Sequence, residues 1–165
     1  ASTDHGAVWQ SVVAAAQVLC PEATTAVTDL PDSTGLVAAL ADTNISLVAS
    51  EEPFTAEADL LFVGSKIRVL DHDMADQLKV KTVVPITRLA LTTRALARCT
   101  NRGVVVAPDF ISAAGALLGT DVVSTTHTLL AELVDHPAGP VIGACLQAEK
   151  FLQTWQDSLP FGRPL

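Results

Sequence analysis

The side chains that could perform chemistry are few in this sequence and lie far apart. Asp71-His72-Asp73 places three potential metal ligands in a row. Consecutive residues point in different directions and rarely converge on one ion, whereas Asp71 is well placed to cap a short helix. We therefore predict a solvated helix start at this position, with no metal site.

Isolated nucleophiles and bases give no stronger signal. His127 could act as a base near Asp121, but such a residue is more often a hydrogen-bonding group on a helix surface. Ser112 lacks the surrounding Gly-x-Ser-x-Gly of a hydrolase nucleophile. The three cysteines, an odd number without a C-x-x-C pair, are Cys20, Cys99 and Cys145. This pattern predicts neither disulfides nor a zinc site, so we expect the cysteines to pack in the interior of a protein of the reducing cytoplasm. No catalytic residue is predicted.

Hydrophobic periodicity predicts an alternation of strands and helices that would position any site. The strand candidates are 24–28, 45–49, 60–63, 81–86 and 104–107. The helix candidates are 7–19, 34–41, 71–79, 89–100, 109–118, 122–134 and 143–157. Such alternation implies right-handed crossovers, and therefore an open, doubly wound α/β parallel sheet covered by helices on both faces. We assign residues 1–120 to this domain and 121–165 to a helical C-terminal extension.

Composition narrows the possible partners. The chain has 165 residues, is 49% hydrophobic and only 17% charged, and has a mean hydropathy of +0.40. This apolar excess suggests burial against another chain. Charged residues, Thr or Pro interrupt every long apolar run and the N-terminal segment lacks a basic start, so neither a membrane span nor a signal peptide is predicted. The net charge of −8 disfavours nucleic acid as a partner.

Several blocks occur in an order and spacing similar to one enzyme family. Arg102-Gly103-Val104-Val105-Val106-Ala107-Pro108-Asp109-Phe110 resembles a strand that ends in Pro-Asp before an Asn-Ala-Gly-Gly turn, here Ala113-Ala114-Gly115-Ala116. Leu78-Lys79-Val80-Lys81 is similar to a Leu-Lys-x-Lys strand entry, Ala58-Asp59-Leu60-Leu61 to an Asp-hydrophobic strand, and Val27-Thr28-Asp29 to a strand ending in an acidic residue. Residues 6–118 thus resemble the nucleotide-binding domain of the glutamate/leucine/phenylalanine/valine dehydrogenases.

The resemblance implies a three-layer Rossmann-like fold and the cofactor NAD(P). It implies cofactor-binding roles for Gly6, Asp29, Asp109 and Gly115, with Asp29 meeting the adenosine ribose. The chain differs from the family at positions that contact the cofactor. Only Gly6 remains of the G-x-G-x-x-G fingerprint, Asp4 brings negative charge toward a phosphate, and Trp9 would crowd the helix against the sheet. We therefore expect NAD(P) to bind weakly or not at all.

The family's central first strand is also missing from the sequence, which begins at the glycine-rich turn. Its loss would leave two unpaired strand edges. Three explanations are open: another polypeptide supplies the strand, a segment such as Pro140 to Ala144 fills the slot, or the domain is rearranged.

The sequence is compatible with two functions. In the first, the chain is a catalytically inert relative that serves as an interaction or oligomerisation module, because the family's catalytic lysine and aspartate have no counterpart here. In the second, it is the NAD(P)-binding part of an amino-acid dehydrogenase whose substrate domain is elsewhere. Under the first, we predict self-association or pairing with another protein chain through the last two helices, whose other possible role is packing over the sheet. Their large apolar residues are Leu129, Leu130, Leu133, Leu146, Phe151, Leu152 and Trp155.

Overall fold

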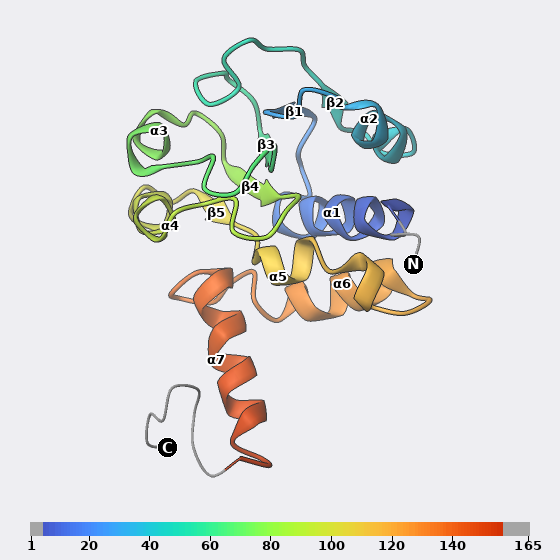
Figure 1. Cartoon of the computed structure of the whole chain (residues 1–165), viewed down its shortest axis with the longest axis vertical. Helices are drawn as coiled ribbons and strands as arrows, with labels where there is room; N and C mark the ends of the chain where they lie inside the picture. The colour runs from blue at the N-terminus through green and yellow to red at the C-terminus, as the bar shows by residue number, and fades with distance from the viewer. Residues whose placement is uncertain (1–4, 157–165) are drawn as a thin grey trace.

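A parallel sheet lies between two helical layers in the computed structural model, which describes residues 5–156 (Figure 1). The strands are β1 (Thr25–Thr28), β2 (Ser46–Leu47), β3 (Leu60–Val63), β4 (Thr82–Pro85) and β5 (Val105–Val106). The helices are α1 (His5–Leu19), α2 (Thr34–Leu40), α3 (His72–Gln77), α4 (Thr93–Asn101), α5 (Asp109–Ser112), the 3₁₀ turn η1 (Gly115–Leu117), α6 (Val122–Ala131) and α7 (Pro140–Leu152). The predicted three-layer, Rossmann-like α/β fold is confirmed.

The five strands follow the order β2-β1-β3-β4-β5, and every pair is parallel. β3 and β4 are buried at all four positions. Runs of apolar residues without alternation are what a parallel sheet covered on both faces requires. Leu61 pairs with Val27 on one side and with Val83 on the other, which makes β3 the centre of the sheet.

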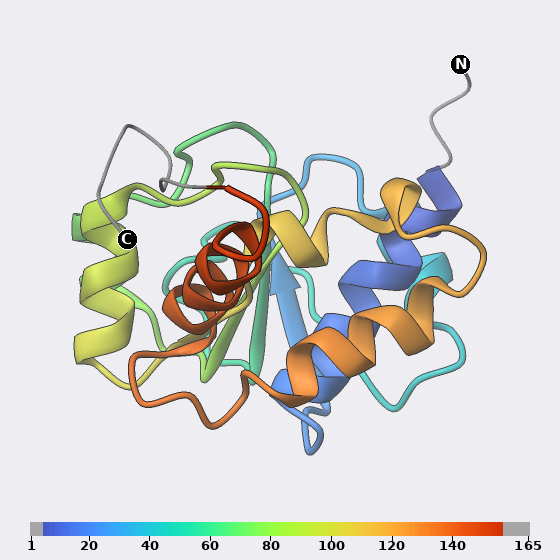
Figure 2. The ribbon, with the colours of Figure 1, turned by 90° about the horizontal axis from the view of Figure 1, so that it is seen from below.

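The direction in which the chain crosses the sheet decides which helix covers which face. From β1 the chain moves outward to β2, whereas from β3 it moves the opposite way to β4 and β5. Right-handed crossovers in opposite directions place their helices on opposite faces. Accordingly, α1, α2 and α6 enclose one apolar core, and α3 and α4 enclose the other (Figure 2).

β1 and β3 are direct hydrogen-bonded neighbours, so the described sheet has no empty slot where the family's first strand would lie. Ala26, Val27 and Thr28 pair with Leu60, Leu61 and Phe62. Of the three explanations, the described residues correspond to a rearranged sheet. The idea that Pro140 to Ala144 fills the slot is wrong, because these residues form the first turns of α7.

Two carboxylates brace this junction, one at each end of the strands. At the amino end, Asp59 accepts hydrogen bonds from the backbone amides of Thr24 (3.0 Å) and Thr25 (3.2 Å) and from the Lys81 ammonium (2.7 Å). At the carboxyl end, Asp29 accepts from Gly64 and Ser65. Together they tie β1 to β3, and Asp59 extends the tie to β4.

Three helices differ most from the sequence prediction. α4 begins at Thr93 because Leu91 still runs parallel to Leu70, and the Thr92 hydroxyl then caps the helix by accepting from the Ala95 amide. The predicted helix over 109–118 is divided into α5 and η1. α7 begins at Pro140, a residue suited to the first helical position, and ends at Leu152.

The last two helices have different environments. α6 packs on α1 and buries Val122, Thr126 and Leu130. Leu130 and Leu133 are therefore core residues, and the expectation that they belong to an exposed contact surface is wrong. α7 is buried only near its start, at Pro140, Gly143 and Ala144, and the rest projects from the body (Figure 1). No helix among residues 5–156 is long and apolar enough to cross a membrane.

Candidate functional site

The candidate site is the edge of the sheet where the strands end, because open parallel sheets bind ligands beyond their carboxyl ends, at the point where the strand order reverses. Here that point lies between β1 and β3. Asp29 directly follows β1, and Asp109 opens α5 soon after β5. Gly6 lies in the first turn of α1, and Gly115 begins η1.

Asp29 is already bonded within the chain. Its Oδ1 accepts the Gly64 amide at 2.8 Å, and its Oδ2 accepts the Ser65 amide at 3.1 Å and the Ser65 hydroxyl at 2.6 Å. A longer contact of 3.4 Å joins the Ser65 amide to Oδ1. A carboxylate offers about four acceptor positions. The group that would meet a ribose in the family is therefore used to hold the end of β3.

Gly115 lies in a close approach between two backbones. A Cβ at this position would lie 1.8 Å from the Ala7 carbonyl oxygen and 2.3 Å from its carbon. The Gly115 amide donates to the Ser11 hydroxyl at 3.1 Å, and that hydroxyl donates to the Ser112 carbonyl at 2.7 Å. The Ser112 hydroxyl in turn donates to the Pro85 carbonyl at 2.7 Å. Gly115 thus joins η1 to α1 and, through Ser112, to the end of β4.

The start of α1 has no glycine-rich turn within the described residues. Gly6 is exposed, and Asp4 lies outside them. The expectation that Trp9 crowds α1 against the sheet is wrong: its ring lies over Gly35 of α2, where an added Cβ would meet the indole nitrogen at 2.6 Å. Gly6 and Trp9 instead line an open trough of about 450 Å³ between α1 and α2.

Asp109 is linked to a strained loop. It accepts a hydrogen bond from the Leu89 amide, and the Leu89 carbonyl accepts from the Arg68 amide at 2.7 Å. Leu89 and Arg68 have φ of 58° and 53°, in the left-handed region that costs a non-glycine residue about 1–2 kcal/mol. Ala113, at the family's asparagine position, lines a small cavity of about 130 Å³ with Arg88 and Asp109.

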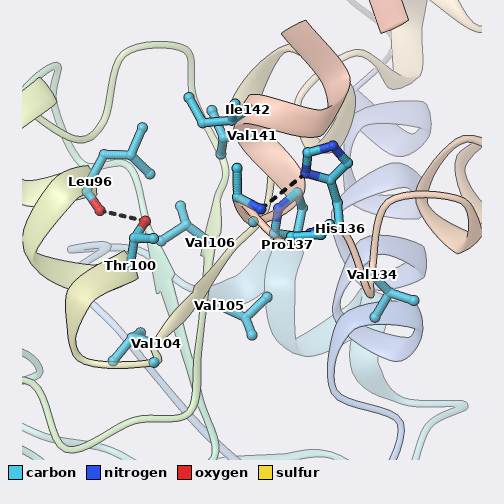
Figure 3. Close-up of a pocket in the computed structure, with 14 residues that line it drawn as sticks. Leu96, Thr100, Val104, Val105, Val106, Val134, His136, Pro137, Val141 and Ile142 are labelled. Atoms are coloured by element: carbon cyan, nitrogen blue, oxygen red, sulfur yellow. Dashed lines mark hydrogen bonds between the residues drawn. The ribbon is translucent and has the colours of Figure 1, made fainter. Parts of the chain in front are cut away.

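Two cavities of about 200 Å³ or more lie near the sheet ends. One, of about 320 Å³, lies at the carboxyl ends of β1 and β2, where Thr28, Leu30 and Ser33 contribute to its wall. The other, of about 200 Å³, lies beside β5 between α4 and the start of α7 (Figure 3). Its walls are mainly aliphatic, with His136 the titratable group among them; Leu96, Val104, Val106, Val141 and Ile142 are typical. This second cavity has no pair of groups for acid–base chemistry.

The remaining sequence candidates do not join this site. The ligand atoms of Asp71, His72 and Asp73 lie within 4.8 Å of one another, but the Asp71 carboxylate caps α3 by accepting from the Asp73 and Met74 amides at 3.0 Å each. His127 is exposed on α6. All three cysteines are free, and burial raises the pKa of the Cys99 thiol to about 11.

Sequence reasoning missed several side chains that hold neighbouring elements together. Ser11 and Ser65 are short polar residues without a distinguishing motif, and their roles depend on partners about 100 and 36 residues away. Asp59 and Lys81 could have been paired, since both lie in the blocks that resemble the dehydrogenase family. The hydrogen bond from Lys81, followed by that from the Thr24 amide, holds the pKa of Asp59 well below its usual range.

Comparison with known proteins gives matches in structure alone. No family model matches the sequence, and no curated protein matches it significantly. A hetero-hexameric glutamate dehydrogenase from Thermus thermophilus is similar, with a TM-score of 0.64 and 19% identity over 91% of this chain and 49% of that one. Another glutamate dehydrogenase gives 0.70 and 13%, over 91% and 53%.

The L-tryptophan dehydrogenase of Nostoc punctiforme is also similar, with a TM-score of 0.64 and 13% identity over 91% of this chain and 60% of that one. The chain therefore spans about half the length of the dehydrogenases that it resembles. At these identities the similarity establishes architecture only. The chain has the Rossmann-like α/β fold that these amino-acid dehydrogenases contain.

Proposed function

We propose that this chain is a catalytically inert relative of the amino-acid dehydrogenase nucleotide-binding domain, and that it serves as an interaction or oligomerisation module. The proposal rests on the hydrogen bonds that Asp29 already accepts within the chain. Both its oxygens accept hydrogen bonds from Gly64 and Ser65, so a ribose diol would compete with bonds that hold β1 and β3 together. The free thiols of Cys20, Cys99 and Cys145 support placing the chain in a reducing cytoplasm.

Exposed apolar side chains on α7 and directly after it support association. Leu146, Phe151 and Trp155 are 50%, 65% and 60% exposed, and the last two rings contact each other edge to face at 6.3 Å. Aromatic residues are enriched where proteins bind one another. Self-association is the simplest form, since twofold dimers are the commonest closed assemblies.

Calorimetry with NAD and NADP tests the nucleotide half of the proposal. We expect dissociation constants weaker than millimolar, which corresponds to less than about 4 kcal/mol of binding free energy. Asp29→Asn should lower stability without altering the heat of mixing with either nucleotide. A micromolar constant that Asp29→Asn weakens would overturn the inert assignment.

Light scattering tests the association half. We expect a mass near twice the 17.2 kDa of the chain. Trp155→Asp with Leu152→Asp should shift the mass to that of the monomer, whereas His127→Asp on the exposed surface of α6 should leave the dimer intact. A wild-type chain that stays monomeric at high micromolar concentration would contradict self-association.

A second candidate function is the NAD(P)-binding part of an amino-acid dehydrogenase whose substrate domain is elsewhere. The cavity of about 320 Å³ at the carboxyl ends of β1 and β2 favours it, because that is where nucleotides bind in open α/β sheets. Under this assignment Gly6, Asp29, Asp109 and Gly115 would lie along the cofactor, and Val37→Asp at the cavity wall would abolish nucleotide binding. The same calorimetry separates the two functions.

A further inference from the structure

One face of α7 carries a stripe of uncharged residues that extends from the body of the protein toward the projecting end of the helix (Figure 1). The stripe repeats at alternating intervals of four and three residues, and we call it the seam: Val141, Cys145, Ala148, Leu152 and Trp155. It includes Trp155 because helical bonding continues past the last residue of α7, with the Gln156 amide donating to the Leu152 carbonyl at 2.9 Å. Such a repeat is the pattern by which one helix packs along another.

The seam begins at the apolar cavity of about 200 Å³ beside β5. Val141 of α7 belongs to the wall of this cavity, together with Leu96 and Thr100 of α4 and Val106 of β5 (Figure 3). Among the described residues, no Lys, Arg, Asp or Glu side chain lines it. An apolar cavity of about 150 Å³ is large enough to hold benzene. The cavity beside β5 therefore has room for one aromatic ring.

An aromatic ring lies at the other end of the seam. Trp155 is 60% exposed, and its ring contacts that of Phe151, which is 65% exposed, edge to face at 6.3 Å. Trp155 follows Val141 by 14 positions, so at about 1.5 Å per residue the two lie roughly 20 Å apart along the helix. The ring therefore cannot enter the cavity of its own chain. It can enter the cavity of a second copy whose α7 runs antiparallel to the first.

We propose that two copies of the chain pair through antiparallel seams, with Trp155 of each copy in the cavity beside β5 of the other. This inference rests on the proposed self-association and specifies the surface that makes it. Val141 and Trp155 both lie seven positions from Ala148, so a twofold axis at Ala148 places each tryptophan beside the partner's Val141 and its cavity. The assembly is closed, because each copy supplies one ring and one cavity.

The charges of α7 lie outside the seam. The small side chain of Ala148 lets the two helices approach closely at the axis. Lys150 lies two positions from Ala148, which is about 200° around the helix, and so it remains in solvent on the opposite side. Glu149 flanks the axis in both copies, so the two carboxylates repel each other weakly. Salt screens this repulsion, and we expect the dimer to tighten as ionic strength rises.

Analytical ultracentrifugation of the full chain tests the docking of the ring by measuring the dissociation constant of the dimer. Trp155→Ala should raise this constant at least about tenfold, because buried aromatic side chains dominate the affinity of interfaces. Thr100→Trp should raise it to a similar extent, since the new ring fills the cavity from α4 and leaves α7 unchanged. Gln77→Trp is the matched control and should change it less than about twofold. Thr100 and Gln77 are both exposed, uncharged and bonded to the carbonyl four residues before them.

Disulfide cross-linking tests the position of the axis, in a chain that carries Cys20→Ser and Cys145→Ser. Ala148→Cys places a thiol at the axis, where oxidation by copper phenanthroline should join two copies covalently. Lys150→Cys places the thiol on the opposite side of the helix and is the control. It should cross-link at least about tenfold more slowly, because its two Cα atoms lie too far apart for a disulfide. Neither change alters the cavity or the ring that enters it.

The other outcomes separate this inference from the proposed function. A dimer that Thr100→Trp leaves as tight as the wild type would overturn the docking of Trp155, while self-association itself would stand. Equal cross-linking of Ala148→Cys and Lys150→Cys, or a dimer that salt weakens, would overturn the antiparallel seam in the same way. A wild-type chain that stays monomeric at high micromolar concentration would overturn both the seam and the proposed self-association.

Discussion

Replacing Gly115 by alanine should separate a structural role from a cofactor-binding role. The added Cβ would lie 1.8 Å from the Ala7 carbonyl oxygen and 2.8 Å from the Ser11 hydroxyl, whereas carbon atoms in contact are normally about 3.5–4.0 Å from their neighbours. The nearest atom belongs to the backbone of α1, so no rotamer change relieves the clash. α1 and η1 would have to move apart by more than about 1 Å.

This movement would also disrupt a buried hydrogen-bond network. The Ser11 hydroxyl contacts the Val8 carbonyl at 2.9 Å, the Ser112 carbonyl at 2.7 Å and the Gly115 amide at 3.1 Å. Overpacking costs about 1–3 kcal/mol and a buried polar group left without its partner costs about 1–3 kcal/mol. We expect Gly115→Ala to lower the free energy of unfolding by about 3–4 kcal/mol, a large part of the roughly 5–15 kcal/mol typical of a domain.

Urea unfolding followed by far-ultraviolet circular dichroism measures this difference. Ala116→Ser, at the exposed next position of η1, is the matched control and should change stability by less than about 0.5 kcal/mol. A loss below about 1 kcal/mol for Gly115→Ala would refute the reasoning, because it would mean that the two backbones separate at little cost.

Three other substitutions and treatments test separate features. Asp59→Asn should lower the free energy of unfolding by about 1–2 kcal/mol at pH 7. Lys81 and the Thr24 amide hold the folded pKa of Asp59 below its unfolded value. The stabilisation is therefore fully present above about pH 4 and is lost gradually as pH falls further. In urea titrations the difference between the two proteins should therefore be smaller at pH 3 than at pH 7, and some of it should remain at pH 3. Thr126→Val should raise the melting temperature, because the buried Thr126 hydroxyl has no hydrogen-bond partner in the described chain and its removal should stabilise by about 1 kcal/mol. Cys145 is exposed and Cys99 is buried with a pKa raised to about 11, so a thiol reagent at pH 8 should label Cys145 in the folded protein and Cys99 only in denaturant, as peptide mass spectrometry would show.

The sequence was sufficient for the element order because local signals were strong. The runs Leu60–Val63 and Thr82–Pro85 form buried strands, and Gly103 closes α4 with φ of 73°. The start of α2 has two residues of good capping type, and the Asp32 carboxylate accepts the Thr34 amide, whereas the Ser33 side chain makes no cap hydrogen bond. Both residues are good capping types, so only the backbone geometry distinguishes them.

The sequence predicted where the candidate site residues lie, but not which hydrogen bonds they make. Asp29 and Asp109 do lie at the carboxyl edge of the sheet, as the family resemblance implied. Their engagement by Ser65 and Leu89 could not be foreseen, because it depends on β1 lying directly beside β3 and on a left-handed backbone at a leucine. Periodicity reports which residues face the core and carries no information on which strands become neighbours.

The projecting helix α7 has a consequence for how the protein opens. Only its first turns are buried, at Pro140, Gly143 and Ala144, and an isolated helix of about 13 residues is marginally stable in water. Its later turns therefore form a separate unit of low stability, whereas β3, buried and paired on both sides, shares the stability of the whole sheet. Amide hydrogens near Phe151 should exchange with solvent through local fraying, long before those of Leu61 and Phe62, which exchange only when the entire domain unfolds.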